Sequence, residues 1–275
     1  MKSVITVIKE QFQNFYLIRR LSFYELKSVN NSNYLGIAWE FINPLIQILI
    51  YWFVFGYGIR ARADVELSSG EFVPFLPWMI TGFILWNLFY QSTILGSKSI
   101  YTRLRILSKM NFPLSIIPNI VIFSQLYIHI FMILLAVTIL FIFGYTIDIY
   151  FIQIFYYLFA TVVFSYSLAL ITSTLSTIIR DIHMLLNASL RLLLYVSPIL
   201  WSTDASKMDS WVTTIMRLNP LYYLIEGYRA SFFGLGWYFY ERSHYTLYFW
   251  LLNLILLFIG SKLHMRFRRH LIDYL

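Results

Sequence analysis

The stretch from Trp39 to Ile59 constrains what this chain can fold into, because Glu40 is its only charged residue. A helix needs about 20 predominantly apolar residues to cross the hydrocarbon core of a bilayer. Gly36 permits a bend before the stretch, and Pro44 suits a first helical turn, where its missing N–H would be unpaired in any case. The stretch therefore predicts a membrane-spanning helix whose tryptophan lies at the water–lipid boundary.

Composition extends this prediction to the whole chain of 275 residues, which is 59% hydrophobic and only 12% charged. Soluble globular domains have about 25% charged residues. The absence of cysteine excludes structural disulfides, iron–sulfur clusters and thiol catalysis. The net charge of +8 does not predict a nucleic-acid partner, because in a membrane protein the distribution of Lys and Arg matters more than their total. We therefore expect an all-α integral membrane protein.

The apolar pattern predicts six transmembrane helices in a single domain, residues 1–275. The expected spans are 39–59, 75–96, 119–143, 151–179, 184–201 and 246–263. Two further apolar segments, 207–218 and 221–233, are too short or too polar to cross, so we expect re-entrant half-helices between spans five and six. The bundle covers 37–264, between an N-terminal region (1–36) and a tail (265–275).

Residues 2–20 predict an amphipathic helix that lies along the membrane surface with its cations at the headgroups. Its apolar face has Val4, Ile8, Phe12, Phe15 and Ile18 at helical spacing. A helix packed against the bundle or against a partner subunit would show the same pattern, and the sequence favours neither. Most of the Lys and Arg residues fall in the N-terminal region, the 97–118 loop and the tail. The positive-inside rule therefore predicts that both termini are cytoplasmic and that the half-helices face outward.

Three motifs resemble a known family of membrane proteins. The entry to the first span has the pattern Tyr-x-Leu-Gly-x-x-Trp-x-x-x-x-Pro, matched by Tyr34, Leu35, Gly36, Trp39 and Pro44. Similar motifs occur at 109–118, and at 197–201 together with 219–229. In order and spacing they resemble ABC-2 type permease subunits of polysaccharide and teichoic acid ABC exporters. The runs 31–36 and 109–118 are most similar to the wall teichoic acid branch.

This resemblance implies a homodimer in the bacterial cytoplasmic membrane that binds two copies of an ABC ATPase subunit and contacts membrane lipids. It implies export of undecaprenyl-diphosphate-linked wall teichoic acid, with lipid-linked O-antigen or capsular polysaccharide as the alternative. From a different class, an ATP-independent lipid flippase or a membrane-embedded lipid enzyme stays open. The sequence has no phosphate-binding G-x-x-x-x-G-K-[ST] loop. We therefore expect ATP and Mg in the partner, and neither a cofactor, a metal nor a catalytic residue in this chain.

The loop at 97–118 contains four cations and no acid, which suits docking of an ATPase that transmits a rigid-body motion to the flanking spans. An ordinary positive-inside loop is the alternative. The residues expected to couple to the ATPase are Lys98, Arg103, Arg105, Lys109, Phe112 and Pro113. The resemblance adds Arg180, Asp181 and His183 as a second contact.

Aromatic and uncharged polar residues in the spans predict a path for a hydrophilic polymer, because aromatic faces pack against sugars and amides replace lost water. The expected path residues are Tyr51, Trp52, Trp86, Asn87, Tyr90 and Gln91. Ordinary aromatic belts and helix contacts would give the same composition. We expect Arg19, Arg20, Lys27 and Arg191 to bind the lipid headgroup, although Arg191 can also snorkel or pair with Glu40 or Asp181.

Two further predictions concern single side chains. Glu226 and Arg229 are three residues apart, so they can pair and stabilise the second half-helix. His129 lies within the third span. There a hydrogen-bonded core histidine is more common than a ligand.

Overall fold

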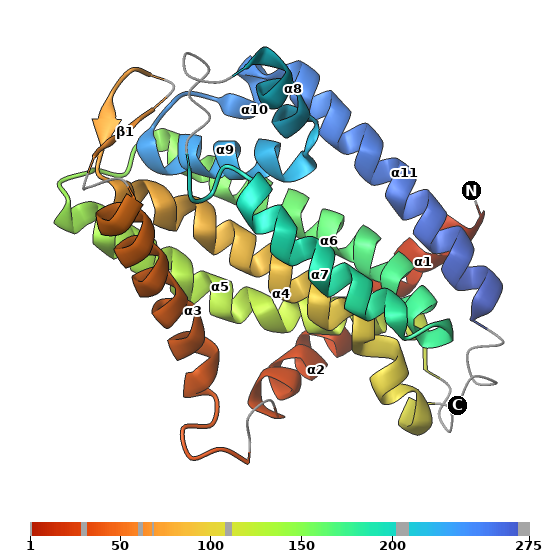
Figure 1. The fold of residues 1–275 in the computed structure, drawn as a ribbon. Helices are drawn as coiled ribbons and strands as arrows, with labels where there is room; N and C mark the ends of the chain where they lie inside the picture. Colours follow the sequence, from red (N-terminus) through yellow and green to blue (C-terminus); the bar gives the residue numbers. More distant parts are fainter. Residues whose placement is uncertain are drawn as a thin grey trace.

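The computed structural model describes residues 2–28, 32–59, 63–67, 69–107, 112–201 and 209–268, and nearly all of its secondary structure is helical (Figure 1). The first part contains α1 (Lys2–Gln13), α2 (Phe15–Ser28), α3 (Ala38–Tyr51), the π-helical η1 (Trp52–Ile59), β1 (Val65–Glu66), β2 (Phe72–Val73) and α4 (Phe75–Leu107). The middle contains the 3₁₀ turn η2 (Leu114–Ile116), α5 (Ile117–Ile142), η3 (Ile149–Ile152), α6 (Gln153–Ile178) and α7 (Asp181–Val196). The last part contains α8 (Ser210–Leu218), α9 (Pro220–Phe233), α10 (Tyr238–Glu241) and α11 (Ser243–Phe267).

Within the described residues, four helical segments are long and apolar enough to cross a membrane. They are Ala38–Ile59, Leu114–Ile142, Ile149–Ile178 and Ser243–Phe267. Helix α4 is long but interrupted by polar side chains, and α7 has only 16 residues, so neither is among the four. Helices also form at the two predicted half-helices, as α8 and α9. The six-span and re-entrant arrangement itself stays a prediction.

Helix α4 lies at the centre of the fold and packs against α5, α6, α7 and α9, while α11 lies against α6 (Figure 1). Helix α4 approaches α6 closely at Gly96, where an added Cβ would lie 2.8 Å from the Cβ of Ala169. Only a glycine lets the two backbones approach to this distance. The apolar pattern of the sequence therefore predicts only part of the helix around which the bundle core is built.

The helix of the predicted second span does not end near Gly96 but continues to Leu107, while the bounds of the span in the membrane stay a prediction. Two serines continue the helix instead of breaking it: Ser97 Oγ donates to the Ile94 carbonyl at 2.8 Å, and Ser99 Oγ to the Gly96 carbonyl at 2.7 Å. The amphipathic helix expected within the 97–118 loop is thus the last part of α4. Any displacement of this amphipathic part is therefore a displacement of α4 itself.

The N-terminal end of the first span also differs from the prediction. Backbone hydrogen bonds from Ala38 to Leu35 and from Trp39 to Gly36 start the helix earlier, so Pro44 lies inside α3 rather than in its first turn. Gly36 provides the expected bend, with φ of +49°. The loop after the span forms an antiparallel β1–β2 hairpin that the sequence did not indicate.

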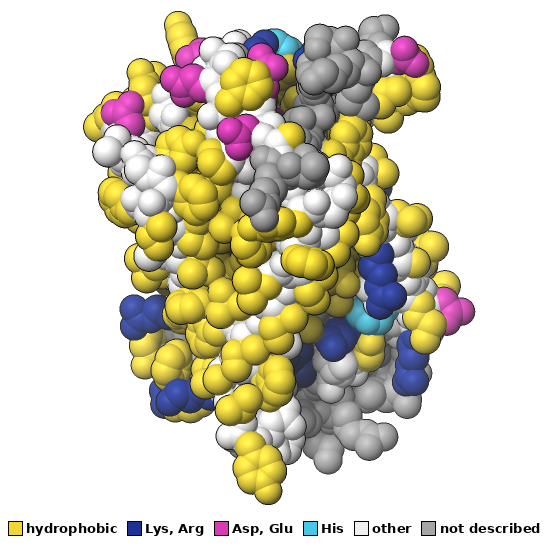
Figure 2. All heavy atoms as spheres, turned by 60° about the vertical axis from the view of Figure 1, so that its left-hand side comes forward, with side chains coloured by type: hydrophobic (Ala, Val, Ile, Leu, Met, Phe, Trp, Pro, Cys, Tyr) yellow, Lys and Arg dark blue, Asp and Glu magenta, His cyan; other side chains and the backbone are white. Residues whose placement is uncertain are grey.

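Charged side chains separate toward the two ends of the molecule. Figure 2 shows most Asp and Glu side chains gathered at the end where the hairpin lies, most Lys and Arg at the other end, and hydrophobic side chains between them. This distribution is typical of a membrane protein with its cationic end in the cytoplasm. It suits the predicted topology.

The N-terminal region packs against the bundle instead of lying apart from it. Val7 is fully buried with Tyr166 and Leu257, and Ile18 is fully buried with Ile116. Large apolar side chains on the other face stay exposed, among them Phe12. The helix predicted as one element breaks at Asn14 into α1 and α2. Of the two alternatives left open, the structure supports packing against the bundle and leaves an apolar outer face.

Candidate functional site

A seam of aromatic and polar side chains lies between α4 and α7. The Tyr90 hydroxyl donates a hydrogen bond to Asn187 Oδ1 at 3.1 Å. Trp86 stacks on Tyr90 with 5.9 Å between ring centroids, since residues four apart share a helix face. We call this region the α4–α7 seam.

Helix α3 adds a third side to the seam. Tyr51 is half-buried where α3 meets α4, and Tyr195 lies on α7, so all three helices contribute a tyrosine. The ring of Tyr51 packs edge-on against Phe83 at 5.6 Å, which fixes its direction. Tyr195 is more than half exposed. The predicted residues Tyr51, Trp86 and Tyr90 are thus brought together.

Sequence reasoning missed Asn187 and Tyr195. Both belong to a stripe on α7, His183, Asn187, Arg191 and Tyr195, whose members are four residues apart and therefore share a face. That spacing was the signal that could have identified them. Arg191, predicted to bind the headgroup, is exposed on this stripe.

The remaining predicted path residues do not all join the seam. The ring of Trp52 contacts Tyr57 within η1, at 5.1 Å between centroids. Asn87 is buried inside the bundle, and Gln91 is half-buried on α4. Trp86 is buried as well, with 4% of its surface exposed against 6% for Asn87. Side chains as enclosed as these two serve helix packing better than contact with a sliding polymer.

The seam continues to the cationic end of the molecule through His183. Ser97 Oγ already donates to a backbone carbonyl, so it accepts a hydrogen bond from His183 Nδ1, at 2.7 Å. Partial burial, and secondly the charge of Lys98, lower the pKa of the His183 side chain. Arg180 and Asp181 are exposed at the start of α7, where the acid also suits the helix dipole. Four of the predicted coupling residues, Lys98, Arg180, Asp181 and His183, thus lie at one end of the α4–α7 contact.

Two of the other predicted coupling residues, Arg103 and Phe112, contact the N-terminal helices. Arg103 forms an ion pair with Glu25 of α2 and donates to the Ser99 carbonyl at 2.9 Å. Phe112 is half-buried against two apolar clusters, one of which contains Ile18, and Pro113 precedes η2 in an extended conformation. Phe112 therefore has a packing role within the chain, and its contact with an ATPase stays a prediction. Lys109 and the side chain of Arg105 lie outside the described structure.

The three remaining cations predicted to bind the lipid headgroup are exposed on α2. They are Arg19, Arg20 and Lys27. The ammonium group of Lys27 lies 4.6 Å from the centroid of the Phe23 ring, which is itself exposed. Cations beside exposed aromatic rings are typical of a membrane interface. Contact with a headgroup stays a prediction.

Glu226 and Arg229 form the expected ion pair on α9, at 2.6 Å. The guanidinium of Arg229 is buried and lies 3.7 Å from the Trp78 ring centroid on α4. Gly82 leaves room for it, because a Cβ there would lie 2.9 Å from Nη2. The pair therefore anchors α9 to the central helix. His129 is a core histidine, with Nε2 2.7 Å from the hydroxyl of Tyr228.

The described residues contain no group of three or more His, Asp or Glu side chains that could hold a metal ion. What the seam offers instead is a row of hydroxyl, amide and aromatic groups. Such groups bind sugars weakly through ring stacking and exchangeable hydrogen bonds.

Comparison with known proteins identifies relatives along most of the chain. Residues 16–233 match the model of a family described as ABC-2 type transporter. An O-antigen export system permease protein RfbA from Klebsiella pneumoniae is 29% identical over 247 residues, which cover 88% of this chain and 90% of that protein. The RfbA permease of Myxococcus xanthus is 23% identical over 231 residues, covering 84% and 85% of the two chains.

Proposed function

Because this chain belongs to the ABC-2 type transporter family, we propose that it is the membrane subunit of an ATP-driven exporter of lipid-linked polysaccharide. ATP and Mg bind to a separate ATPase chain, in keeping with a sequence that has no phosphate-binding loop. The observation that carries the proposal is the α4–α7 seam. There the hydroxyl and ring of Tyr90 and the amide of Asn187 offer hydrogen bonds and a stacking surface, backed by the buried ring of Trp86, inside an otherwise apolar bundle.

The substrate we propose is a lipid-linked glycan of the O-antigen class. Wall teichoic acid was the first expectation, but the relatives are named as O-antigen export permeases, which favours the alternative. Teichoic acid stays a second candidate because the runs 31–36 and 109–118 resemble that branch. An ATP-independent flippase or a lipid enzyme would need neither an ATPase partner nor a path for a polymer.

The proposed assembly is a homodimer with six spans per chain in a bacterial cytoplasmic membrane, with two ATPase subunits on the cationic face. Helix α4 has 33 residues, more than the roughly 20 that a bilayer core requires, so it spans despite its polar side chains. The part of α7 from Met184 onward forms the fifth span together with residues 197–201, and α8 and α9 are re-entrant. The exposed faces of α3 and α7 meet their counterparts across the dimer, which encloses the seam.

In the proposed mechanism, the ATPase presses on the segment that follows α4 and on the start of α7. Because α4 is one continuous helix, a displacement at Lys98 reaches Tyr90 without an intervening hinge. The Ser97–His183 hydrogen bond carries α7 with it. Rigid elements of this kind transmit a partner's motion to a distant site.

The experiment that tests this function is ATP hydrolysis and export by the chain reconstituted in liposomes with its ATPase. We expect stimulation by a neutral lipid-linked glycan of the O-antigen class. Stimulation by lipid-linked teichoic acid alone would transfer the assignment to the second candidate. Lipid translocation by the isolated chain, without an ATPase, would contradict an ATP-driven exporter.

A matched pair of variants tests the seam itself. Asn187→Leu removes the acceptor of the Tyr90 hydroxyl and should lower export while the complex still assembles. Ser189→Ala changes an exposed residue two positions further along α7 and should leave export unchanged. Equal export by the two variants would remove the seam from the path.

A further inference from the structure

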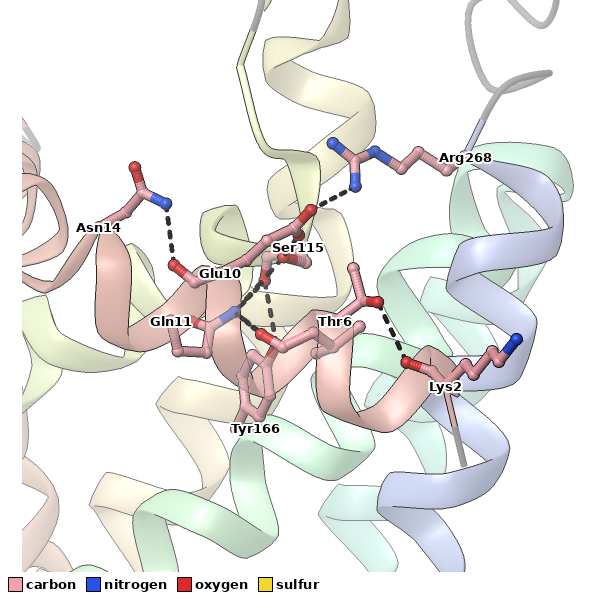
Figure 3. Close-up of polar contacts among 9 residues, drawn as sticks. Lys2, Thr6, Glu10, Gln11, Asn14, Ser115, Tyr166 and Arg268 are labelled. Carbon is pink, nitrogen blue, oxygen red and sulfur yellow. Dashed lines mark hydrogen bonds and ion pairs between the residues drawn. The ribbon is translucent and has the colours of Figure 1, made fainter.

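The N-terminal helix α1 is joined by a network of hydrogen bonds to η2, which directly follows the segment 108–113 between α4 and η2 (Figure 3). We call this part of the predicted 97–118 loop the coupling segment. Gln11 Nε2 lies 3.2 Å from the Ser115 carbonyl on η2 and 2.8 Å from the Tyr166 hydroxyl on α6. Gln11 Oε1 accepts a hydrogen bond from Asn119 Nδ2 at 3.1 Å. The Tyr166 hydroxyl in turn donates to the Ser115 carbonyl at 3.1 Å. One glutamine thus joins α1, η2, α5 and α6.

Glu10 extends the network to the other end of the chain. Its carboxylate accepts a hydrogen bond from the Ser115 hydroxyl and forms an ion pair with Arg268 at 2.5 Å, just after α11 (Figure 3). Both charged side chains are largely enclosed, with 16% of Glu10 and 29% of Arg268 exposed. Partly buried pairs of this kind depend less on salt than pairs on an open surface.

Helix α2 holds the opposite end of the same segment. Glu25 pairs with Arg103 in the last turns of α4, before the segment begins. Ile18 is buried against Ile116 and Ile120, which follow the segment. The α1–α2 unit therefore contacts the chain on both sides of the segment that joins α4 to α5.

The direction of these side chains shows whether α1 is bound to the rest of the protein or only lies on the membrane surface. A surface helix would point its glutamines and carboxylates toward water. On α1, Gln13 does so and is exposed, whereas Glu10 and Gln11 point into the protein and are bound there. The polar inner face of α1 is used for contacts within the chain.

We propose that α1 and α2 form a transmission clasp, in which Glu10, Gln11 and Glu25 are positioning residues. They hold both ends of the coupling segment against α6 and α11, so that a push on the segment moves α4, α5, α6 and α11 as one unit. The clasp stays closed throughout the transport cycle. This inference rests on the proposed function, since it concerns how an ATPase drives export.

The first test compares Gln11→Leu with Gln13→Leu in the reconstituted complex, measuring polymer exported per ATP hydrolysed. We expect Gln11→Leu to lower this ratio about fivefold or more, the usual lower range for coupling between sites, and Gln13→Leu to leave it unchanged. An unchanged ratio for Gln11→Leu would overturn the proposal. Absence of ATP-dependent export by the unmodified complex would instead refute the proposed function.

A cross-link tests whether the clasp stays closed, and the absence of cysteine gives a clean background. In Gln11→Cys with Ser115→Cys, the reduced protein should be uncoupled. Joining the two thiols with a short bifunctional reagent should restore export per ATP, even if the unlinked variant is unstable. Arrest of export by the cross-link would show that the contact must open, which overturns the proposal.

A charge exchange tests the α2 contact. Glu25→Arg and Arg103→Glu should each lower export per ATP, and the double variant should restore it because the ion pair re-forms in reverse. Failure of the double variant would remove Glu25 from the clasp and return Arg103 to direct contact with the ATPase.

Discussion

Helices α6 and α3 both belong to candidate membrane spans, yet the bundle buries a much larger share of α6 than of α3. In the most apolar window of the α6 segment, with a mean hydropathy of 1.9, 56% of the residues are buried inside the protein. In the α3–η1 segment, with a mean hydropathy of 1.5, only 17% are buried. Hydropathy therefore identifies a span but does not say whether it faces protein or lipid.

Residue size and polarity account for the difference. Helix α6 presents small polar residues to its neighbours, and Ser167 Oγ donates to Asn253 Oδ1 of α11 at 2.8 Å. Small residues let helices approach closely, and hydrogen bonds between helices add to the contact. Helix α3 instead exposes large side chains such as Leu49 and Phe53. A rigid unit around α6 and a peripheral α3 follow from this contrast.

The largest expected effect comes from separating α4 from α6. Gly96→Leu places a side chain where a Cβ already meets Ala169, so we expect destabilisation of about 3 kcal/mol, at the upper end of overpacking effects. Thermal unfolding in detergent measures it. Gly58→Leu is the control, since nothing lies within 4 Å of a Cβ there. Equal unfolding temperatures for both variants would contradict the close approach.

Neighbouring residues on α3 sharpen the comparison within one helix. Ile48 is 4% exposed and Leu49 is 59% exposed. Ile48→Ala should cost about 2 kcal/mol, at the low end for a buried side chain because α3 has few contacts. Leu49→Ala should change the stability of the monomer by less than about 0.5 kcal/mol. A large loss for Leu49→Ala would show that α3 is not peripheral.

The hydrogen bond between α6 and α11 should contribute less. A double-mutant cycle of Ser167→Ala and Asn253→Leu should give a coupling free energy of about 0.6 kcal/mol, as such bonds average within membrane proteins. Steric trapping in bicelles provides the free energies of unfolding. Strictly additive single-variant effects would show that the contact contributes nothing.

The smallest effect concerns pH at the start of α7. Because burial and Lys98 lower the pKa of His183 in the folded protein, the unfolded chain binds a proton more readily. The neutral His183 side chain therefore contributes to the stability of the folded protein above about pH 6.5, and this contribution decreases as the pH falls below that value. In His183→Asn, the free energy of unfolding should decrease less between pH 7 and pH 5 than in the unmodified protein. The difference should be below about 1 kcal/mol, because the His183 side chain is partly exposed. Parallel pH profiles would contradict this assignment.

The sequence predicted the long apolar helices well and the polar contacts poorly. Helices α5, α6 and α11 begin and end within a few residues of the expected spans, because apolar runs bounded by Pro118, Gly144 and Arg266 leave little choice. Where α4 continues past Gly96, Ser97 and Ser99 bond to carbonyls of their own helix, although serine also occurs at helix ends. Residue type alone does not distinguish these roles.

The candidate site was predictable only where one helix contained its residues. Trp86 and Tyr90 are four apart and were identified, whereas Asn187 becomes relevant only when α7 lies beside α4. Gln11 is similar, since its partners Ser115 and Tyr166 are far away in the sequence. Contacts between distant segments require knowledge of the packing, which a single chain without its fold does not provide.

The π-helical turn that ends the first span gives that span a spare residue. In η1 each hydrogen bond reaches back five positions instead of four, and the contact of Trp52 with Tyr57 has the same spacing of five. Rewinding η1 into an α-helix would rotate every later side chain about the helix axis without breaking the chain. The first span thus contains a shift of one residue relative to a regular α-helix, between the buried part of α3 and the β1–β2 hairpin.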